Sequence, residues 1–148
     1  MICEINHDPI FLSQKSVEAT ADDVHIARDL ADTLRANLDR CVGMAANMIG
    51  QRKRIIAIVK GPMIITMMNP KILSKSGEYE AEEGCLSLAG TRKTKRYQSI
   101  RLSWQDVNMK QHTGVMDGFE AQIVQHEVDH CDGILIESTD MQTGKSPI

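Results

Sequence analysis

The sequence of 148 residues predicts one α+β domain that spans residues 1–148. Three observations predict this fold class. An amphipathic helical pattern comes early in the chain, stretches rich in Ile, Val and Met fill its middle, and a second helical pattern with two histidines lies near its end. We therefore expect a leading helix, short antiparallel strands, and a buried helix that carries an H-E-x-x-H motif.

The first helix is expected from Asp22 to Asp39. Its apolar residues recur at helical spacing, and two aspartates suit its first turn. The stripe consists of Val24, Ala27, Leu30, Ala31, Leu34 and Leu38. Such a stripe predicts core packing. Cys41 to Gly50 follows and is dense in small residues, so we expect a loop that lets another backbone approach closely.

The middle of the chain predicts strands. Arg54–Val59 and Met63–Met68 are rich in β-forming residues and are separated by Gly61-Pro62, a turn signal. We expect Asn69-Pro70 to end the second run. The remaining expectations for this region are a strand start and a loop over Lys71–Gly77, a strand over Tyr97–Trp104, and turns at Gln105-Asp106 and His112–Gly114.

Composition limits the classes of function. Hydrophobic residues make up 42% and charged residues 25%, as in ordinary globular proteins. No apolar run approaches the roughly 20 residues that cross a bilayer, and the first residues lack the features of a signal peptide. We therefore expect a cytoplasmic protein with no membrane partner. A net charge of -3 does not favour nucleic-acid binding, and the short basic segment Arg92–Arg96 is expected to be a solvated loop or strand.

The second helix is expected to begin at Gly118 and to stop near Gly133. It contains His126-Glu127-Val128-Asp129-His130. Residues four apart lie on the same face of a helix, so the two imidazoles can bind one divalent metal ion. Glu127 can then take a proton from a metal-bound water. The alternative is a polar helix end that carries two histidines without a metal.

A catalytic metal of this kind has three protein ligands and one open position. The extended H-E-x-x-H-x-x-G-x-x-H motif would need a histidine at position 136, where the chain has Ile136. An upstream ligand is therefore expected, and Cys85 beside Gly84 is the best candidate. Cys131 should point away from the ion, while Cys41 fits either the core or a cleft. An upstream cysteine alone is as often core as ligand.

Three segments together resemble peptide deformylase. Gly43–Met48 is similar to the family's G-L-A-A-x-Q motif, Glu83–Ser87 is its E-G-C-L-S, and His126–His130 is its H-E-x-D-H. The early Asp8-Pro9 and the glycine at position 133 agree with the family as well. The resemblance spans nearly the whole chain, to about residue 137.

The resemblance implies a metal ion held by Cys85, His126 and His130, most often Fe²⁺, with Zn²⁺ or Ni²⁺ as substitutes. It implies removal of the formyl group from N-formylmethionyl peptides, including nascent chains at the ribosome. Glu127 would act as general base and acid, and the backbone N–H of Leu86 would donate to the developing oxyanion.

The resemblance also suggests contacts with the substrate. A peptide would add to an exposed strand edge near E-G-C-L-S. The expected contact residues are Gly43 and Leu86 for the peptide backbone, Arg92 along its path, and Val42, Phe119 and Ile123 around the methionine side chain. The alternative for each of these residues is a role in core packing without any contact with substrate.

The chain departs from the family at two positions. Met48 stands where the family has a glutamine that donates to the oxyanion, and a thioether cannot donate. Ala89 stands where the family usually has proline. Reduced or altered activity is therefore expected. The alternatives are a non-catalytic metal-containing module that binds formylated or methionyl peptides, and a generic H-E-x-x-H endopeptidase.

Overall fold

A computed structural model gives the fold and describes residues 1–85, 88–134 and 140–142. It confirms the predicted α+β class. In chain order the elements are α1 (Pro9–Leu12), η1 (Ala21–Asp23), α2 (Val24–Ala36), β1 (Gly43–Ala45), η2 (Ala46–Ile49), β2 (Ile55–Lys60), β3 (Met63–Cys85), β4 (Leu88–Gln105), β5 (Gln111–Asp117), α3 (Gly118–Cys131) and β6 (Asp140–Gln142).

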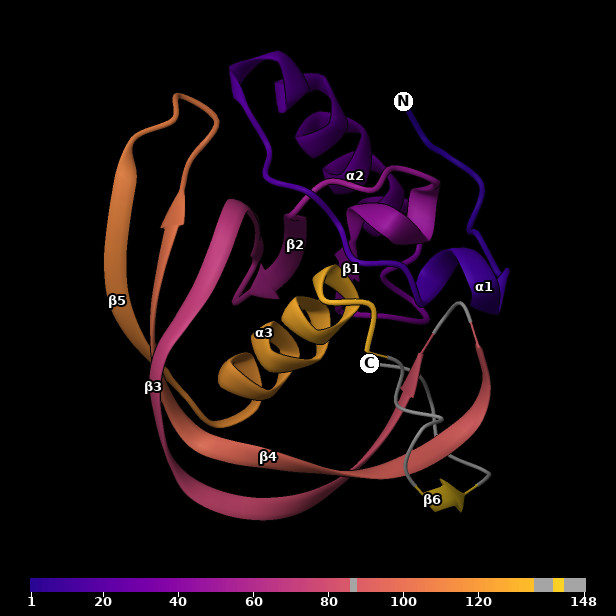
Figure 1. The fold of residues 1–148 in the computed structure, drawn as a ribbon, viewed down its shortest axis with the longest axis vertical. Helices are drawn as coiled ribbons and strands as arrows, with labels where there is room; N and C mark the ends of the chain where they lie inside the picture. The colour runs from indigo at the N-terminus through magenta and orange to yellow at the C-terminus, as the bar shows by residue number, and fades with distance from the viewer. Residues whose placement is uncertain (86–87, 135–139, 143–148) are drawn as a thin grey trace.

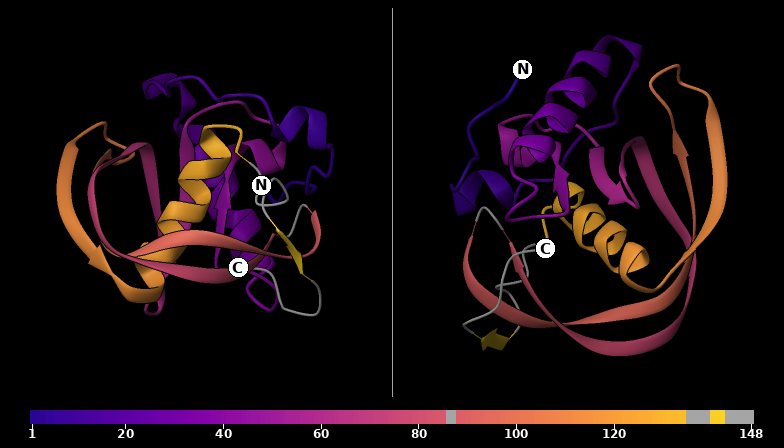
Figure 2. Two further views of the ribbon diagram at one scale, coloured as in Figure 1. Left: turned by 60° about the horizontal axis from the view of Figure 1, so that its bottom comes forward. Right: turned by 180° about the vertical axis from the view of Figure 1, so that it is seen from behind.

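The strands form one antiparallel sheet in which β3 and β4 are much longer than the others. The order is β1-β2-β3-β4-β5, and β6 pairs with β4. The two long strands curve around α3, which lies on their concave side (Figure 1). Helix α2 packs against β1 and β2 (Figures 1 and 2). Helix α3 therefore packs against β1 and β2 as well as against the long strand β4.

Strand β2 separates two hydrophobic clusters. Ile55 and Ala57 belong to the cluster formed with α2, whereas Ile56 and Ile58 belong to the cluster formed with α3. Successive side chains of a strand point to opposite faces. Strand β2 is therefore covered on both faces, which explains why its sequence is a continuous apolar run instead of an alternating one.

The leading helix is confirmed, but it is shorter than predicted. The turn η1 precedes α2, and a capping box starts it: Thr20 Oγ1 accepts from Asp22 N–H, and Asp23 accepts from Thr20 N–H at 2.8 Å. The predicted end at Asp39 is wrong, because the helix ends at Ala36. Leu38, expected in the apolar stripe, is 47% exposed.

Strand β3 continues past the place where its end was predicted. The hairpin of β2 and β3 around Gly61-Pro62 is confirmed, but Asn69-Pro70 does not end the strand. Asn69 adopts a positive φ of 53°, and the register with β4 shifts between Met68 and Lys71. A β-bulge thus accommodates Pro70, which cannot donate to the ladder. The predicted loop within Lys71–Gly77 is wrong, since these residues pair with β4.

Three further expectations need correction. Cys41–Gly50, expected to be a loop, contains β1 and η2. His112–Gly114, expected to be a turn, lies within β5, although the turn after Gln105-Asp106 is present. Arg92–Arg96 was expected to be a solvated loop or strand. It is a strand, but the side chains of Arg92 and Arg96 are buried and not solvated. Pairing between strands orders each of these segments, since β1 pairs with β2, β5 pairs with β4, and Arg92–Arg96 of β4 pair with β3.

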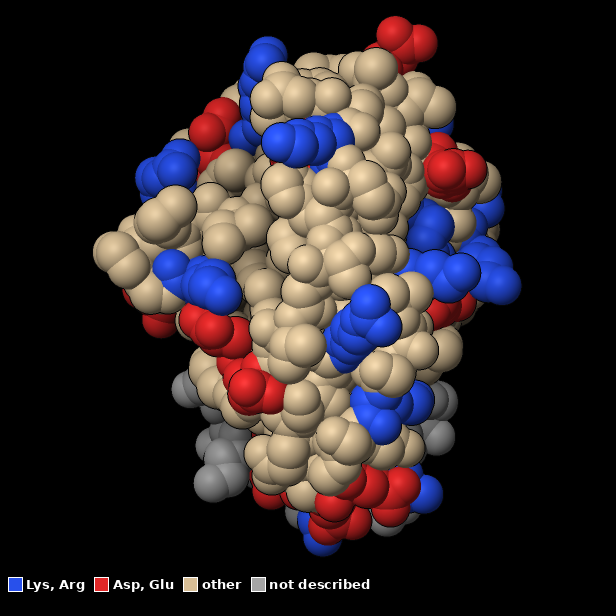
Figure 3. Space-filling model, turned by 90° about the vertical axis from the view of Figure 1, so that its left-hand side faces the viewer, with Lys and Arg blue, Asp and Glu red and all other residues tan. Residues whose placement is uncertain are grey.

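Strand β5 lies at one edge of the sheet. Figure 3 shows this side of the molecule, where an uncharged strip runs between scattered acidic and basic side chains. No helix in the described part of the chain is long and apolar enough to cross a membrane. Of residues 138–148 the structure describes only Asp140–Gln142, as β6 paired with Thr91–Lys93, and the others lie outside the described residues.

Candidate active site

Helix α3 carries the H-E-x-x-H motif into the interior, as predicted. The helix begins at Gly118, which has a positive φ of 63°, and Gly133 beyond its end has a φ of 71°. A Cβ at Gly133 would lie 2.5 Å from Ser13 O, so only glycine lets the N-terminal segment pack there. The histidines and the glutamate of the motif are all buried.

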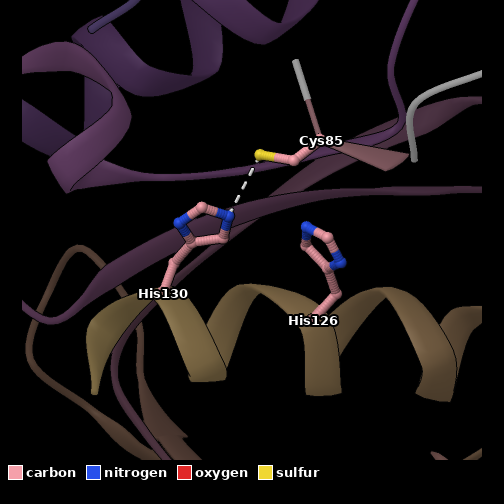
Figure 4. Close-up of side chains that lie close together, drawn as sticks. All are labelled: Cys85, His126 and His130. Carbon is pink, nitrogen blue, oxygen red and sulfur yellow. Dashed lines mark hydrogen bonds between the residues drawn. The ribbon is translucent and has the colours of Figure 1, made fainter. Parts of the chain in front are cut away.

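Cys85, at the end of β3, meets both histidines of α3. Its Sγ lies 3.2 Å from His130 Nε2, and the two imidazole centroids are 5.2 Å apart. Figure 4 shows both rings rising from the helix toward the sulfur. One donor atom from each of the three side chains lies within 4.8 Å of the others. The predicted upstream ligand is therefore beside the helix pair.

This donor set fits a divalent metal ion. A metal with bonds of about 2.0–2.3 Å to nitrogen and sulfur keeps its ligand atoms a few ångströms apart, as they are here. The pKa of Cys85 lies well below its usual value. Burial opposes ionisation of the thiol, but the positive charge of His130 and hydrogen bonds from both imidazoles favour the thiolate. A thiolate is the form of cysteine that binds metals.

The other two buried cysteines differ from Cys85 in their electrostatics. Burial raises the pKa of Cys41 to about 12, and the nearby charge of Glu127 adds to the shift. Burial also raises the pKa of Cys131 to about 12. Cys131 belongs to the hydrophobic cluster around α3 and is not in the ligand group, as expected from its position on the helix.

Glu83 holds His126 in place. Its Oε1 accepts from His126 Nδ1–H at 2.9 Å. Arg96 donates to both carboxylate oxygens of Glu83, at 2.7 and 2.8 Å, and also donates to Asp129 at 2.7 Å. Burial alone would raise the pKa of Glu83, but hydrogen bonds from His126 and Arg96 lower it to about 2. The ionised carboxylate thus fixes the tautomer of His126 and leaves its Nε2 for a metal.

Glu127 is completely buried and has no hydrogen-bond partner for either oxygen among the described residues. Burial raises its pKa to about 7, although the charges of His126 and His130 oppose the shift. The close approach of Gly43 shapes this position, since a Cβ there would lie 2.6 Å from Ile123 Cγ2 and 3.0 Å from Glu127 Oε2. An unpaired buried carboxylate is costly, so its presence at this position points to a functional role.

Met48 and Asn47 are both used internally. Met48 is 1% exposed, and its Sδ accepts from Ala45 N–H at 3.4 Å. Asn47 Nδ2 donates to His130 O at 3.0 Å and to Leu12 O at 3.4 Å. Asn47 thus ties η2 to the end of α3, and it does not replace the side-chain donor that Met48 lacks.

The other residues predicted to contact the substrate differ in their exposure. Ile123 is buried beside Gly43, while Val42 is partly buried and its carbonyl accepts from Val59 N–H at 2.9 Å. Phe119 is 56% exposed at the start of α3. Arg92 is buried and donates to Thr91 O, and its Nε has no partner among the described residues. Leu86 lies outside the described residues.

Sequence reasoning missed three residues of this site. Glu83 and Asp129 stand within the E-G-C-L-S and H-E-x-D-H motifs, so their positions next to predicted ligands were a usable signal. Arg96 had no such signal. It lies in a basic segment that reads as solvated, and only the pairing of β3 with β4 brings it to Glu83.

The chain is similar to known proteins over nearly its whole length. Residues 1–143 match the family model described as polypeptide deformylase. A peptide deformylase of Clostridium beijerinckii is 54% identical over 136 residues, which cover 92% of this chain and 100% of that protein. A peptide deformylase of Dictyoglomus thermophilum is 38% identical over 141 residues, or 92% of this chain and 91% of that one.

Solved structures show the same fold. A Met-Ala-Ser-bound class I type b peptide deformylase from Acinetobacter baumannii superposes with a TM-score of 0.84 and 27% identity, covering 93% of this chain and 99% of that one. A peptide deformylase from Thermus thermophilus has a TM-score of 0.82 and 28% identity, with coverage of 93% and 84%.

Proposed function

This chain belongs to the polypeptide deformylase family, and on that premise we propose that it hydrolyses the formyl group from N-formylmethionyl peptides. The products are formate and a peptide with a free α-amino group. The observation that carries this proposal is the group of Cys85, His126 and His130 beside the unpartnered carboxylate of Glu127. These four side chains are the ones that a metal-dependent hydrolase needs.

Members of this family are metal-dependent, and Cys85, His126 and His130 would hold the ion, with Fe²⁺ as the native metal and Zn²⁺ or Ni²⁺ as substitutes. A bound divalent ion supplies Lewis-acid chemistry, because it makes water nucleophilic at neutral pH and polarises a carbonyl group. One thiolate and two imidazoles suit all three of these metals.

Glu127 moves the protons. It accepts a proton as water attacks the formyl carbon, and it donates that proton to the nitrogen of the departing amine when the C–N bond breaks. Its pKa of about 7, raised by burial, suits a group that must both accept and donate near neutral pH. The backbone N–H of Leu86 completes the proposal as a donor to the oxyanion.

The substrate is an extended peptide. By the family resemblance, Gly43 would lie against its backbone, and Val42, Phe119 and Ile123 would surround the methionine side chain. Arg92 would lie along the peptide's path. We further propose that residues 1–148 act as one domain, that the protein works in the cytoplasm, and that its substrates are chains emerging from the ribosome.

The alternative of a non-catalytic module that binds peptides is not favoured. Its support was Met48 alone, whereas Glu127 is intact and the curated relative with 54% identity is a peptide deformylase. A module that only binds peptides has no need for a buried general base.

Release of formate tests the proposal directly. Protein loaded with Fe²⁺ without oxygen should release formate from formyl-Met-Ala-Ser. Glu127→Gln should bind the same amount of iron but turn over about 10²–10⁴-fold more slowly, because it lacks the general base. A wild-type protein that binds iron and the peptide without releasing formate would contradict the proposal.

A further inference from the structure

Gln122 lies on the face of α3 that leads to the candidate metal site. Phe119, Gln122, Ile123 and His126 follow a spacing of three, four and seven residues, which places them along one stripe of the helix. The stripe passes from the exposed Phe119 through the partly buried Gln122 to the buried His126. Gln122 is therefore a polar residue on the same stripe as Phe119 and Ile123, the two helix residues proposed to surround the methionine side chain.

Two contacts fix the orientation of the Gln122 side chain. Its Nε2 donates to Glu83 Oε2 at 3.0 Å, and its Oε1 accepts from the Tyr79 hydroxyl at 3.1 Å. An ionised carboxylate can only accept hydrogen bonds, so the amide nitrogen must face Glu83. The carboxamide is thus held at both ends between α3 and β3 and cannot flip.

One hydrogen of this amide is still available. A carboxamide NH₂ group has two hydrogens. Glu83 is the one acceptor found for the Gln122 nitrogen among the described residues. The second N–H can therefore serve a ligand, from a position that the contacts with Glu83 and Tyr79 have already set.

We propose that Gln122 determines specificity by donating this N–H to the thioether sulfur of the substrate's methionine. The inference rests on the proposed function, because it concerns the side-chain pocket of that reaction. Thioether sulfur is a weak acceptor, and norleucine has the same shape with a methylene in its place. A norleucine side chain would bury the N–H without a partner, so the enzyme should prefer methionine.

Competition between two substrates tests this proposal. Formyl-Met-Ala-Ser and formyl-Nle-Ala-Ser are given together to the Fe²⁺-loaded protein, and the ratio of their kcat/KM values is measured. We expect wild type to favour methionine by about two- to five-fold, the effect of one weak hydrogen bond. Gln122→Leu should bring the ratio to about one. Both substrates meet the same metal site, so a general loss of activity cancels in the ratio.

Gln125→Leu is the matched control. Gln125 is on the same helix, but its Nε2 donates to Ala121 O and Tyr97 O, and its Oε1 accepts from Tyr97 N–H. Both of its N–H groups are taken by the backbone. Replacing Gln125 by leucine should lower the stability of the fold and leave the preference for methionine unchanged. A wild-type ratio near one, or a preference that survives in Gln122→Leu, would overturn the proposal.

Two additions keep the test decisive. If Gln122→Leu does not fold, Tyr79→Phe takes its place, since it frees the carbonyl end of the amide and should reduce the preference; an unchanged ratio would count against the proposal. Calorimetric binding of Met-Ala-Ser and Nle-Ala-Ser measures the same preference without turnover. Absence of formate release contradicts the proposed function, whereas equal binding of the two peptides contradicts the role of Gln122.

Discussion

Glu83 Oε1 accepts a hydrogen bond from His126 Nδ1–H at 2.9 Å. In total, four nitrogen atoms donate hydrogen bonds to the carboxylate of Glu83. Two of these donors come from Arg96 and one from Gln122. The contact fixes which nitrogen of His126 is available to a metal. The candidate metal site therefore depends on a residue that is not itself a ligand.

Glu83→Gln should weaken metal binding by about 10- to 100-fold, because the neutral amide no longer pairs with Arg96 or holds His126 as firmly. Competition with a chelator measures the affinity. Glu82→Gln is the control, since Glu82 is exposed and bonds Thr91 instead. Equal metal affinities in the Glu83 variant and wild type would contradict the role assigned to Glu83.

Met48→Gln should raise kcat toward formyl-Met peptides, by up to about 10²-fold. A glutamine carbonyl can take over the hydrogen bond from Ala45 N–H that Met48 Sδ now accepts, which leaves the amide N–H₂ to donate to the oxyanion. Steady-state kinetics with iron-loaded protein measures the change. Met48→Leu, which can neither accept nor donate, should show no gain; a gain there as well would point to packing.

Gly43→Ala should lower both stability and turnover. The added methyl group would press on Ile123 Cγ2 and Glu127 Oε2, at 2.6 and 3.0 Å, and overpacking of this kind costs about 1–3 kcal/mol. Denaturant unfolding and kcat check the two effects. At Gly114 the nearest atoms to a Cβ are those of Trp104 at 3.7 and 3.8 Å, so Gly114→Ala should be nearly neutral. A fully active Gly43→Ala protein would disprove the close approach.

Asp23 should contribute pH-dependent stability. Burial raises its pKa, but the Thr20 N–H and Lys53 outweigh burial and lower it below 3.8. A group with a lowered folded-state pKa stabilises the fold above its unfolded pKa and loses this effect as the pH falls through the folded value. Asp23→Ala should therefore cost about 1 kcal/mol near neutral pH, as loss of a helix cap does. The difference from wild type should shrink below pH 3.8.

Unfolding curves at several pH values check this expectation. Asp22→Ala serves as the control, since it removes an exposed aspartate from the same turn. A difference between wild type and Asp23→Ala that stays constant as the pH falls would show that the charge of Asp23 is not involved.

Local sequence patterns predicted the elements whose stability is local. Helix α2 and the hairpin of β2 and β3 have a strong apolar pattern or a turn signal, and both are present. The histidines of α3 were predictable because a spacing of four places them on one face in any helix. Cys85 required one further argument, the absence of other ligands, and the structure places it beside both histidines.

Long-range pairing explains what the sequence did not predict. Residues 71–80 of β3 are mostly exposed, so no alternation marks them as a strand, and their pairing with β4 is what orders them. The same pairing buries Arg96 against Glu83, which lies 13 residues earlier in the chain. A basic segment reads as solvated until the fold supplies a buried carboxylate for it.

Metal binding by Cys85 tests the central claim most directly. Protein loaded with Co²⁺ without oxygen should bind one ion per chain and show a thiolate-to-cobalt charge-transfer band in its absorption spectrum. Cys85→Ser should lose that band, while Cys41→Ser, which alters a buried thiol with a raised pKa, should keep it. A band that persists without the sulfur of residue 85 would contradict the site described here.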